Sequence, residues 1–464
     1  MVASAEEFDL VVVGGGPGGY VAAIRAAQLG MRTAVVEKDR LGGVCLNWGC
    51  IPTKALLRSA DVLRLIRHAG TFGIGAEVRQ VDVAAMVARS RAVADRLNKG
   101  VTGLLKKNGV TVVPGHARLT GQGGLQVELA DGTRRALRSP HIILATGARP
   151  RELAMLPVDR ESVWTYREGL VPPSVPESML VIGAGAIGIE FASFYHAVGV
   201  EVTVVEMADC VLPVEDADIS GHVAASLARD GITIHTGAAV ESAERRDGRW
   251  HVGLAGERSA EADVVLVAAG IVGNVEDLGL EHTAVEVDRT HIVTGEHCET
   301  AEPGVYAIGD VAGAPWLAHK ASHEGLLCVE RIAGLAAHRL DPLRVPACTY
   351  SHPQVASVGL TEDRARAAGH EVRVGRFPFS ANGKAIAMGA TEGFAKVVFD
   401  ADSGEMLGAH LVGEEVAEMI QGFVIAQTLE TTEADLMATI FPHPTMSEAM
   451  HEAVLDAWGR TLHL

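Results

Sequence analysis

Cysteine is scarce in this chain. Only six of the 464 residues are cysteines, and four of these stand alone: Cys210, Cys298, Cys328 and Cys348. No Cys-x-x-Cys motif pairs with a second one or with two histidines, which is the spacing that zinc sites use. Isolated cysteines are usually ordinary buried or surface thiols. We therefore predict no metal site, and only Cys45 and Cys50 lie close enough in sequence to act together.

Positive charge and long apolar runs are also lacking. The 40 Lys and Arg residues against 58 Asp and Glu residues give a net charge of −18, which argues against a nucleic-acid partner. The first apolar run follows Glu6, Glu7 and Asp9, has no basic region before it and ends in glycines. We therefore expect no secretory signal and no membrane contact, and a cytoplasmic location in which stable structural disulfides are uncommon.

The residues that are abundant are typical of a large globular protein. Hydrophobic residues make up 48% of the sequence and charged residues 21%. With 464 residues, this composition predicts two to four domains with substantial cores.

The two neighbouring cysteines lie in the segment GGVCLNWGCIPTKAL, residues 42–56. Lys54 follows Cys50 by four residues, and Leu56, Leu57, Leu63 and Ile66 continue a helical pattern. A structural disulfide, a metal site and a redox pair are all compatible with this spacing. The segment should begin a helix, whose N-terminus stabilises a thiolate.

A glycine-rich motif occurs twice. Residues 10–37 and 180–206 each contain an apolar strand, a Gly-x-Gly-x-x-Gly turn, an Ala-containing helix and a second strand that ends in glutamate. The glycines are Gly14, Gly16 and Gly19 in the first copy and Gly183, Gly185 and Gly188 in the second. In both copies the final acid, Glu37 or Glu206, follows the first glycine by 23 residues.

This order of strand, turn, helix, strand and acid predicts a dinucleotide-binding βαβ unit in each copy. The glycines let backbone N–H groups approach a pyrophosphate at the helix N-terminus, and the acid accepts hydrogen bonds from a ribose. No Arg or Lys follows Glu206 directly, so the second site should favour NAD over NADP.

Other segments complete a three-part organisation. The strands of HIILATGARP (141–150) and ADVVLVAAGIVGN (262–274) end near glycines, and GVYAIGDVAG (304–313) delivers Asp310 to a loop, where it either binds a ribityl hydroxyl or caps a helix. We predict that residues 1–148 and 277–346 form the first nucleotide-binding domain and residues 149–276 the second. From residue 347 onward, alternating β-branched segments followed by helical patterns predict a separate α+β domain.

Together these motifs resemble the pyridine-nucleotide disulfide oxidoreductases over essentially the whole chain. The shared segments stand in the family order: GGGPGG, GGVCLNWGCIPTKAL, ATGARP, GAGAIGIE, YAIGDV, YSHPQVASVGLTE and HPTMSEA. The segment CLNWGCIPTK resembles the corresponding segment of the family branch that acts on lipoamide rather than that of the glutathione branch. Two departures are the absence of an Arg after Gly270 and the absence of a C-terminal cysteine pair, which mercuric reductases use.

The resemblance implies a fold and a reaction. The fold is α/β, with two Rossmann-like domains for FAD and NAD and a C-terminal α+β dimerisation domain. The reaction is oxidation of protein-bound dihydrolipoamide through a redox-active Cys45–Cys50 disulfide and FAD, with hydride transfer to NAD. The partners implied are a second copy that shares the active site, a lipoyl-bearing protein, and the core of a 2-oxo acid dehydrogenase complex or the glycine cleavage system.

Roles for individual residues come with the resemblance. Cys45 is the interchange thiol and Cys50 faces the flavin, while Lys54 and Glu190 meet near the reactive flavin nitrogen. His443 is the base that takes a substrate proton, since imidazole titrates near neutral pH, and Glu448 orients it.

The cofactor contacts carried over fall into two sets. The FAD set is Gly14, Gly16, Pro17, Gly19, Glu37, Lys38, Gly43, Lys54, Ala117, Thr146, Gly147, Asp310 and Ala318. The NAD set is Gly183, Gly185, Ile187, Gly188, Glu190, Glu206, Val240 and Gly270. The rival reading is another disulfide reductase of this family, with a glutathione-like or metal substrate, against which Glu206 argues because glutathione-type enzymes use NADP.

Overall fold

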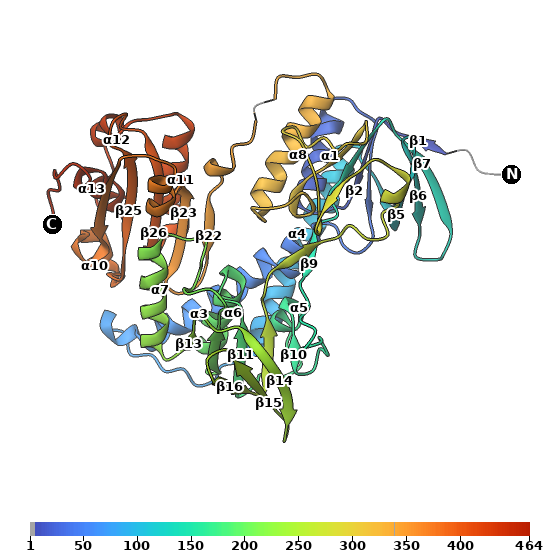
Figure 1. Cartoon of the computed structure of the whole chain (residues 1–464). Helices are drawn as coiled ribbons and strands as arrows, with labels where there is room; N and C mark the ends of the chain where they lie inside the picture. Colours follow the sequence, from blue (N-terminus) through green and yellow to red (C-terminus); the bar gives the residue numbers. More distant parts are fainter. Residues whose placement is uncertain (1–4, 338) are drawn as a thin grey trace. The chain divides into compact units, whose positions relative to one another are not determined.

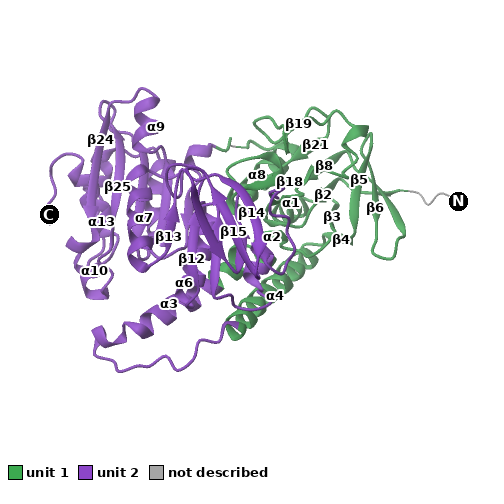
Figure 2. Cartoon of the chain, turned by 60° about the horizontal axis from the view of Figure 1, so that its bottom comes forward, with its two compact units in different colours: residues 1–55, 84–151, 270–340 green, residues 56–83, 152–269, 341–464 purple. Residues whose placement is uncertain are grey.

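The chain folds into two compact units, each made of three separate stretches of sequence. A computed structural model describes residues 5–337 and 339–464. Unit 1 takes its described residues from 1–55, 84–151 and 270–340, and unit 2 comprises 56–83, 152–269 and 341–464 (Figure 2). The division cuts helix α3 (Cys50–Arg67), which begins in unit 1 and ends in unit 2.

A five-stranded parallel sheet is the centre of unit 1. Its order is β21 (Val305–Ala307), β8 (His141–Leu144), β2 (Leu10–Val13), β3 (Thr33–Glu37) and β4 (Thr111–Pro114). Strand β2 is LVVV, buried along its whole length, as expected for a parallel strand that is covered on both faces.

Successive residues of strand β2 point to opposite faces of the sheet, and each face is covered by a different layer. Leu10 and Val12 pack with helices α1 (Pro17–Gln28), α4 (Val83–Lys107) and α8 (Ala318–Ile332), and α1 lies against α8 (Figure 1). Val11 and Val13 pack with an antiparallel meander on the other side. The meander strands are β7 (Arg134–Arg138), β6 (Gly124–Glu128) and β5 (His116–Gly121), and the short strand β1 (Glu6–Glu7) adds to β7 in parallel.

Unit 2 repeats this plan in its first half. The parallel order is β10 (Val163–Trp164), β17 (Val264–Val267), β11 (Ser178–Ile182), β12 (Glu201–Val205) and β13 (Thr233–His235). Helix α6 (Ala186–Ala197) follows β11 as α1 follows β2. The three-stranded meander β14 (Val240–Arg246), β15 (Arg249–Leu254) and β16 (Arg258–Ala262) packs on this sheet. The duplicated sequence motif therefore folds into duplicated three-layer architecture.

The last part of unit 2 contains a five-stranded sheet whose strand pairs are all antiparallel. Its order is β22 (Ala347–Thr349), β23 (Gln354–Gly359), β26 (Met406–Gly413), β25 (Gly393–Asp400) and β24 (Val372–Pro378). Helices α11 (Val416–Thr428) and α13 (Glu448–Asp456) pack on it through Phe423, Met450 and Val454. This is the α+β arrangement predicted from the alternating segments after residue 347.

The remaining elements, apart from the 14-residue helix α7, are short. In unit 1 they are α2 (Gly43–Trp48), β9 (Ala148–Pro150), β18 (Ile271–Gly273), β19 (Val287–Asp288), β20 (His291–Ile292) and the 3-10 turns η2 (Leu280–His282) and η3 (Gly309–Ala312). In unit 2 they are η1 (Ala69–Phe72), α5 (Tyr166–Leu170), α7 (Ala217–Asp230), η4 (Pro342–Arg344), α9 (Glu362–Ala367), η5 (Phe379–Ala381), α10 (Gly383–Met388) and α12 (Glu433–Ala438). Within the described ranges, no helix has the length and apolar character needed to cross a bilayer.

The predicted fold class is confirmed by the two parallel sheets and the antiparallel sheet. The predicted domain limits at residues 148, 276 and 346 stay a prediction.

Candidate active site

The first glycine turn lies between β2 and α1. Gly14 has a φ of 109°, and a Cβ built on it would overlap the carbonyl of Ala145. A Cβ on Gly19 would overlap the carbonyl of Gly14. Gly16 is the N-cap of α1 and has no side chain to cap it, so N–H groups of the first helical turn are left for a ligand. This cradle fits a pyrophosphate.

The second turn, between β11 and α6, has the same construction. Gly183 has a φ of 105°, and its Cβ would overlap the carbonyl of Ala268. A Cβ on Gly188 would overlap the carbonyl of Gly183, and Gly185 is an N-cap without a side-chain bond. The second cradle therefore also fits a dinucleotide.

The two terminal acids hold their turns in the same way. Glu37 Oε2 accepts a hydrogen bond from Gly15 N–H at 2.7 Å, and Oε1 accepts one from Asp39 N–H at 2.8 Å. Glu206 accepts equivalent bonds from Ala184 N–H at 2.7 Å and Ala208 N–H at 2.8 Å. The backbone bonds fix each carboxylate beside its turn and leave further lone pairs for ribose hydroxyls.

The two cysteines lie on either side of a break between two helices. Cys45 is in α2, Gly49 ends α2 with a φ of −144°, and Cys50 is the first residue of α3. The helix predicted to begin in this segment is α3, and the short helix α2 before it was not predicted. The Cys45 and Cys50 thiols are hydrogen-bonded to each other across the break.

The electrostatics of this pair differ from the simple helix-terminus expectation. The hydrogen bond to Cys50 and burial raise the pKa of Cys45, and the nearby Lys54 acts in the opposite direction. The thiols share one buried site, so a charge on one opposes ionisation of the other. Cys50, at the N-terminus of α3, has the helix dipole in its favour.

Asp310 joins this cluster within unit 1. It lies in η3, at the carboxyl end of β21, and its charge acts on Cys45. Burial raises the pKa of Asp310, while Lys320 lowers it. The turn that carries Asp310 is therefore near enough to the cysteine pair for its charge to act on Cys45.

A buried ion pair that sequence reasoning missed holds the Asp310 turn. Glu324 accepts a hydrogen bond from Gly309 N–H at 2.7 Å, and Lys320 Nζ donates to Gly313 O at 3.0 Å. Lys320 and Glu324 are 2.7 Å apart and one helical turn apart on α8. Their spacing of four in HKASHEG was the available signal, although it is equally typical of a surface helix pair.

Thr146, Gly147 and Gly270 lie around a connection formed by β9 and β18. Thr146 Oγ1 donates to Asn274 O at 2.8 Å, and Asn274 Nδ2 donates to Thr146 O at 2.9 Å. Gly147 and Gly270 have φ angles of 69° and 95°, and β9 pairs antiparallel with β18. Three of the predicted cofactor residues are thus brought to one place in unit 1.

The other predicted cofactor residues are spread over both units. In unit 1, Pro17 is the first residue of α1, Lys38 follows β3, Gly43 begins α2, Ala117 is buried in β5 and Ala318 begins α8. In unit 2, Ile187 lies exposed in α6 and Val240 begins β14.

Glu190 lies in α6 of unit 2 and is 5% exposed. Its Oε1 accepts a hydrogen bond from Tyr350 N–H at 2.9 Å. The predicted pairing of Glu190 with Lys54 joins different units and stays a prediction.

His443 and Glu448 form a pair just before and at the start of α13. His443 Nδ1 lies 2.8 Å from Glu448 Oε1, and Glu448 Oε2 accepts a hydrogen bond from Thr445 N–H at 2.9 Å. Burial acts to raise the pKa of Glu448, but the bonds from Thr445 and His443 outweigh it and leave the pKa lowered. The carboxylate therefore stays ionised and orients the ring, with Nε2 left for proton transfer.

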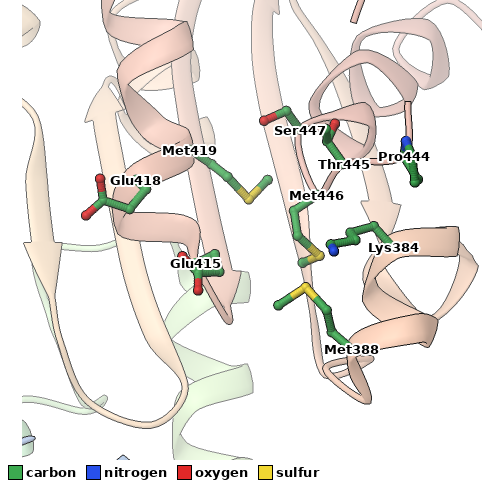
Figure 3. A pocket seen from close by; sticks show the side chains of 9 residues that line it. All are labelled: Lys384, Met388, Glu415, Glu418, Met419, Pro444, Thr445, Met446 and Ser447. Atoms are coloured by element: carbon green, nitrogen blue, oxygen red, sulfur yellow. The ribbon is translucent and has the colours of Figure 1, made fainter. Parts of the chain in front are cut away.

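The His443 side chain is 78% exposed in the single chain. A pocket lies beside its loop, with Glu415 and Glu418 on one side and Met446, Lys384 and Met388 on the other (Figure 3). Residues 444–447 line this pocket, and the glycine turns do not. Over the described ranges, no group of His, Cys, Asp and Glu residues has the arrangement of a metal site.

The sequence matches two family models of known proteins. Residues 8–325 match the family described as pyridine nucleotide-disulphide oxidoreductase, and residues 345–454 match the dimerisation domain of the same family. The chain belongs to the pyridine nucleotide-disulphide oxidoreductases. It is therefore an oxidoreductase with FAD and NAD as cofactors, and it carries the domain through which the family forms homodimers.

Named relatives align along nearly the whole chain. A dihydrolipoyl dehydrogenase of Zymomonas mobilis is 53% identical over 99% of this chain and 100% of its own length. One from Rhizobium etli is 52% identical over 99% and 100%.

Two solved structures are also similar. LpdA from Mycobacterium tuberculosis has a TM-score of 0.91 at 28% identity, covering 97% of this chain and 99% of its own. A Cu(II) complex of RclA, an HOCl-induced flavoprotein disulfide reductase of Escherichia coli, has a TM-score of 0.87 at 25% identity, with the same coverage.

Proposed function

We propose that this chain oxidises protein-bound dihydrolipoamide to lipoamide with NAD as the final acceptor. The observation that carries the proposal is the Cys45–Cys50 pair, which is hydrogen-bonded across the break at Gly49 and lies within reach of the charges of Lys54 and Asp310. A dithiol substrate matches a two-cysteine site, because exchange of one disulfide for another conserves the number of sulfur–sulfur bonds. The relatives named dihydrolipoyl dehydrogenase support this substrate class.

The thiol half of the reaction is an exchange in two steps. A substrate thiolate attacks Cys45 of the disulfide, forming a mixed disulfide and releasing Cys50 as a thiolate. The second substrate thiol then attacks the mixed disulfide, which closes the ring of lipoamide and leaves both protein thiols reduced. Bound FAD supplies the two-electron chemistry that links thiols to a hydride acceptor, which side chains cannot do alone.

FAD is assigned to the first glycine turn and NAD to the second. The first turn is covered by residues 41–56, the redox segment that contains Cys45 and Cys50. A Cβ built on Gly43 of this segment would lie 2.8 Å from Gly16 Cα. Gly185 has open space around it in the described ranges, with nothing within 4 Å of a built Cβ. A covered site suits a cofactor that stays bound through many turnovers, and an open site suits one that exchanges in each.

His443 is assigned as the base that removes the substrate proton. Its exposure and its fixed contact to Glu448 suit a base presented to a site on another surface. We assign that site to the Cys45–Cys50 pair of the partner subunit, so each dimer contains two shared active sites. Lys54 and Glu190 are assigned to the flavin edge.

The further partners are a lipoyl-bearing protein and the core of a 2-oxo acid dehydrogenase complex or the glycine cleavage system, in the cytoplasm. The net charge of −18 suits docking on a basic peripheral domain.

The test is a visible spectrum followed through one turnover. The purified dimer should show flavin absorption, gain a long-wavelength band on addition of dihydrolipoamide without oxygen, and return to its first spectrum on addition of NAD. Oxidised glutathione with NADPH should give less than about a hundredth of the kcat/KM. Turnover with glutathione or a metal salt, but none with dihydrolipoamide, would favour the rival disulfide reductase.

A further inference from the structure

Helix α4 donates side-chain hydrogen bonds to the backbone of the redox segment at several points. The carbonyls that accept them lie on both sides of the break at Gly49, in residues 41–55. The donors and acceptors are Asn98 Nδ2 to Leu41 O at 2.6 Å, Arg91 to Asn47 O, Ser90 Oγ to Pro52 O at 2.9 Å and Arg89 to Ala55 O at 2.8 Å. All of these residues belong to unit 1.

These donors are placed on α4 by helical geometry. Ser90 and Ala94 are fully buried and lie one helical turn apart, with Asn98 one turn further on. Val101 and Leu105 continue this face into the core of unit 1. The helix is therefore anchored by its apolar end and presents its polar end to the redox segment.

Arg91 contacts the break itself. Its guanidinium carbon lies 4.5 Å from the centre of the Trp48 ring, and one nitrogen donates to Asn47 O. Asn47 and Trp48 are the last two residues of α2, where carbonyls have no partner within the helix. The planar guanidinium can make both contacts at once, because its face lies over the Trp48 ring while its N–H groups donate hydrogen bonds in its own plane.

The position of this break decides how the two sulfurs meet. Cys45 precedes it and Cys50 follows it, so a small rotation at residues 47–49 changes the sulfur–sulfur separation. Disulfides form readily only when the two Cβ atoms are held at a narrow range of distances. A contact that fixes the break therefore raises the effective concentration of one thiol beside the other.

We propose that Arg91 is a positioning residue that sets the stability of the Cys45–Cys50 disulfide relative to the dithiol, through its contacts to Asn47 and Trp48. The inference rests on the proposed function of the cysteines as a redox pair. Arg91 itself takes no part in electron or proton transfer.

The experiment measures a thiol–disulfide equilibrium rather than turnover. The flavin-containing dimer is equilibrated without oxygen and without NAD in mixtures of reduced and oxidised dithiothreitol. In the reaction, reduced dithiothreitol gives two electrons and two protons to the disulfide and closes to its own cyclic disulfide. The fraction of reduced pairs is read by acid quenching, alkylation and mass spectrometry of the peptide that contains both cysteines.

Arg91→Met should shift the equilibrium about tenfold toward the dithiol, which equals roughly 30 mV for a two-electron couple. Arg96→Met is the matched control, because Arg96 lies on the same helix, is exposed and loses the same charge. It should stay within about twofold of the parent. Arg91→Lys keeps the charge without the planar stack and should fall between Arg91→Met and the parent.

Two results would overturn the proposal. One is an equal constant for Arg91→Met and Arg96→Met, and the other is full restoration by Arg91→Lys, which would assign the effect to charge alone. If Arg91→Met does not give a folded dimer, Arg91→Gln keeps a donor for Asn47 O without the charged plane over Trp48; it should also shift the constant toward the dithiol, and an unchanged constant would overturn the proposal. A parent protein that forms no Cys45–Cys50 disulfide would refute the proposed function itself, which separates the two failures.

Discussion

The two glycine turns are built from the same parts but are covered by different segments. In each, the chain returns after the terminal acid and donates a hydrogen bond to the middle carbonyl of the turn, from Gly42 to Gly15 at 2.7 Å and from Leu212 to Ala184 at 2.8 Å. After Gly42 the chain continues across the turn into α2 and the cysteines. After Leu212 it leaves through the exposed Val214 toward α7.

On the proposed assignment of FAD to the first turn and NAD to the second, this difference gives the two copies of one motif different functions. The glycines and the acid are needed for any dinucleotide, so they are the same in both copies. The segment after the acid decides whether the site is closed and equipped with thiols or left open. On this assignment, the connection after each βαβ unit determines which chemistry its site supports, and variants of both copies test that difference.

The largest expected effect comes from the pair Cys45 and Cys50, because the segment after the second acid contains only the single Cys210. Cys45→Ser and Cys50→Ser should each abolish dihydrolipoamide oxidation, because a single thiol cannot form the internal disulfide. Cys45→Ser should also show a long-wavelength absorption band without reductant, from the Cys50 thiolate beside the flavin. Reversed spectra for the two variants would contradict the assigned roles, and NADH oxidation with an artificial acceptor should persist in both.

His443→Ala should lower dihydrolipoamide oxidation by about 10²–10⁴-fold, since a positioned general base is lost. Neither glycine turn includes this residue, so FAD content and NADH oxidation with an artificial acceptor should not change. Glu448→Gln should lose less, because it orients the ring through the 2.8 Å contact to His443.

The shared site is tested by mixing two inactive variants. Exchange of subunits between Cys45→Ser and His443→Ala dimers gives mixed dimers with one intact site if the base acts on the partner subunit's Cys45. Activity should then return. No recovery in confirmed mixed dimers would place the base and the cysteines in the same subunit.

Adding one methyl group to each turn tests the covered and open sites directly. Gly43→Ala should weaken FAD retention at least about tenfold, since Gly43 has a φ of 58° and its Cβ would press on Gly16. Gly185→Ala has space for the Cβ and should keep FAD while raising the KM for NAD about tenfold. The measurements are the flavin-to-protein ratio after gel filtration and steady-state kinetics. Equal effects of both variants on both cofactors would remove the proposed distinction.

Glu206 should give at least about a tenfold preference for NAD over NADP in kcat/KM, because a 2′-phosphate would meet its carboxylate. Glu206→Arg should narrow that preference. The carboxylate also accepts bonds from Ala184 and Ala208 N–H, so Glu206→Gln is the control that keeps an acceptor without the charge. Equal use of both nucleotides by the parent would refute the assignment.

Glu215, in the segment after the second acid, should affect stability rather than activity. Burial raises the pKa of Glu215 to about 7. Its folded pKa lies above the unfolded value near 4.5, so its stabilisation is complete below pH 4.5 and lost as the pH rises through 7. Glu215→Gln cannot ionise and should gain stability over the parent at pH 8, by about 3 kcal/mol at most.

The thermal unfolding midpoints of Glu215→Gln and the parent at pH 5.5 and pH 8 measure this effect. The exposed Glu241→Gln serves as the control and should show the same small difference at both values of pH. A pH-independent gain for Glu215→Gln would contradict the linkage.

The parts of this protein that depend on neighbouring residues could be predicted from the sequence alone. The run LVVV, the glycines at fixed spacing and an acid 23 residues later depend on neighbours within one βαβ unit, so both nucleotide cradles were predictable from residues 10–37 and 180–206. The His443–Glu448 pair was also predictable from local sequence, because the two residues are five positions apart and Glu448 is the first residue of α13.

Features that depend on packing between distant elements were visible only in the three-dimensional structure. The predicted helix begins at Cys50, but the sequence did not predict the short helix α2 or the break at Gly49, across which the two thiols are hydrogen-bonded. The donors from α4 to Asn47 and Pro52, and the Glu324 bond to the Asp310 turn, join residues 15 to 44 positions apart. Polar side chains such as Arg91 and Glu324 carry no sequence signal that separates a buried hydrogen bond from an exposed one, so their partners are defined only when the layers pack together.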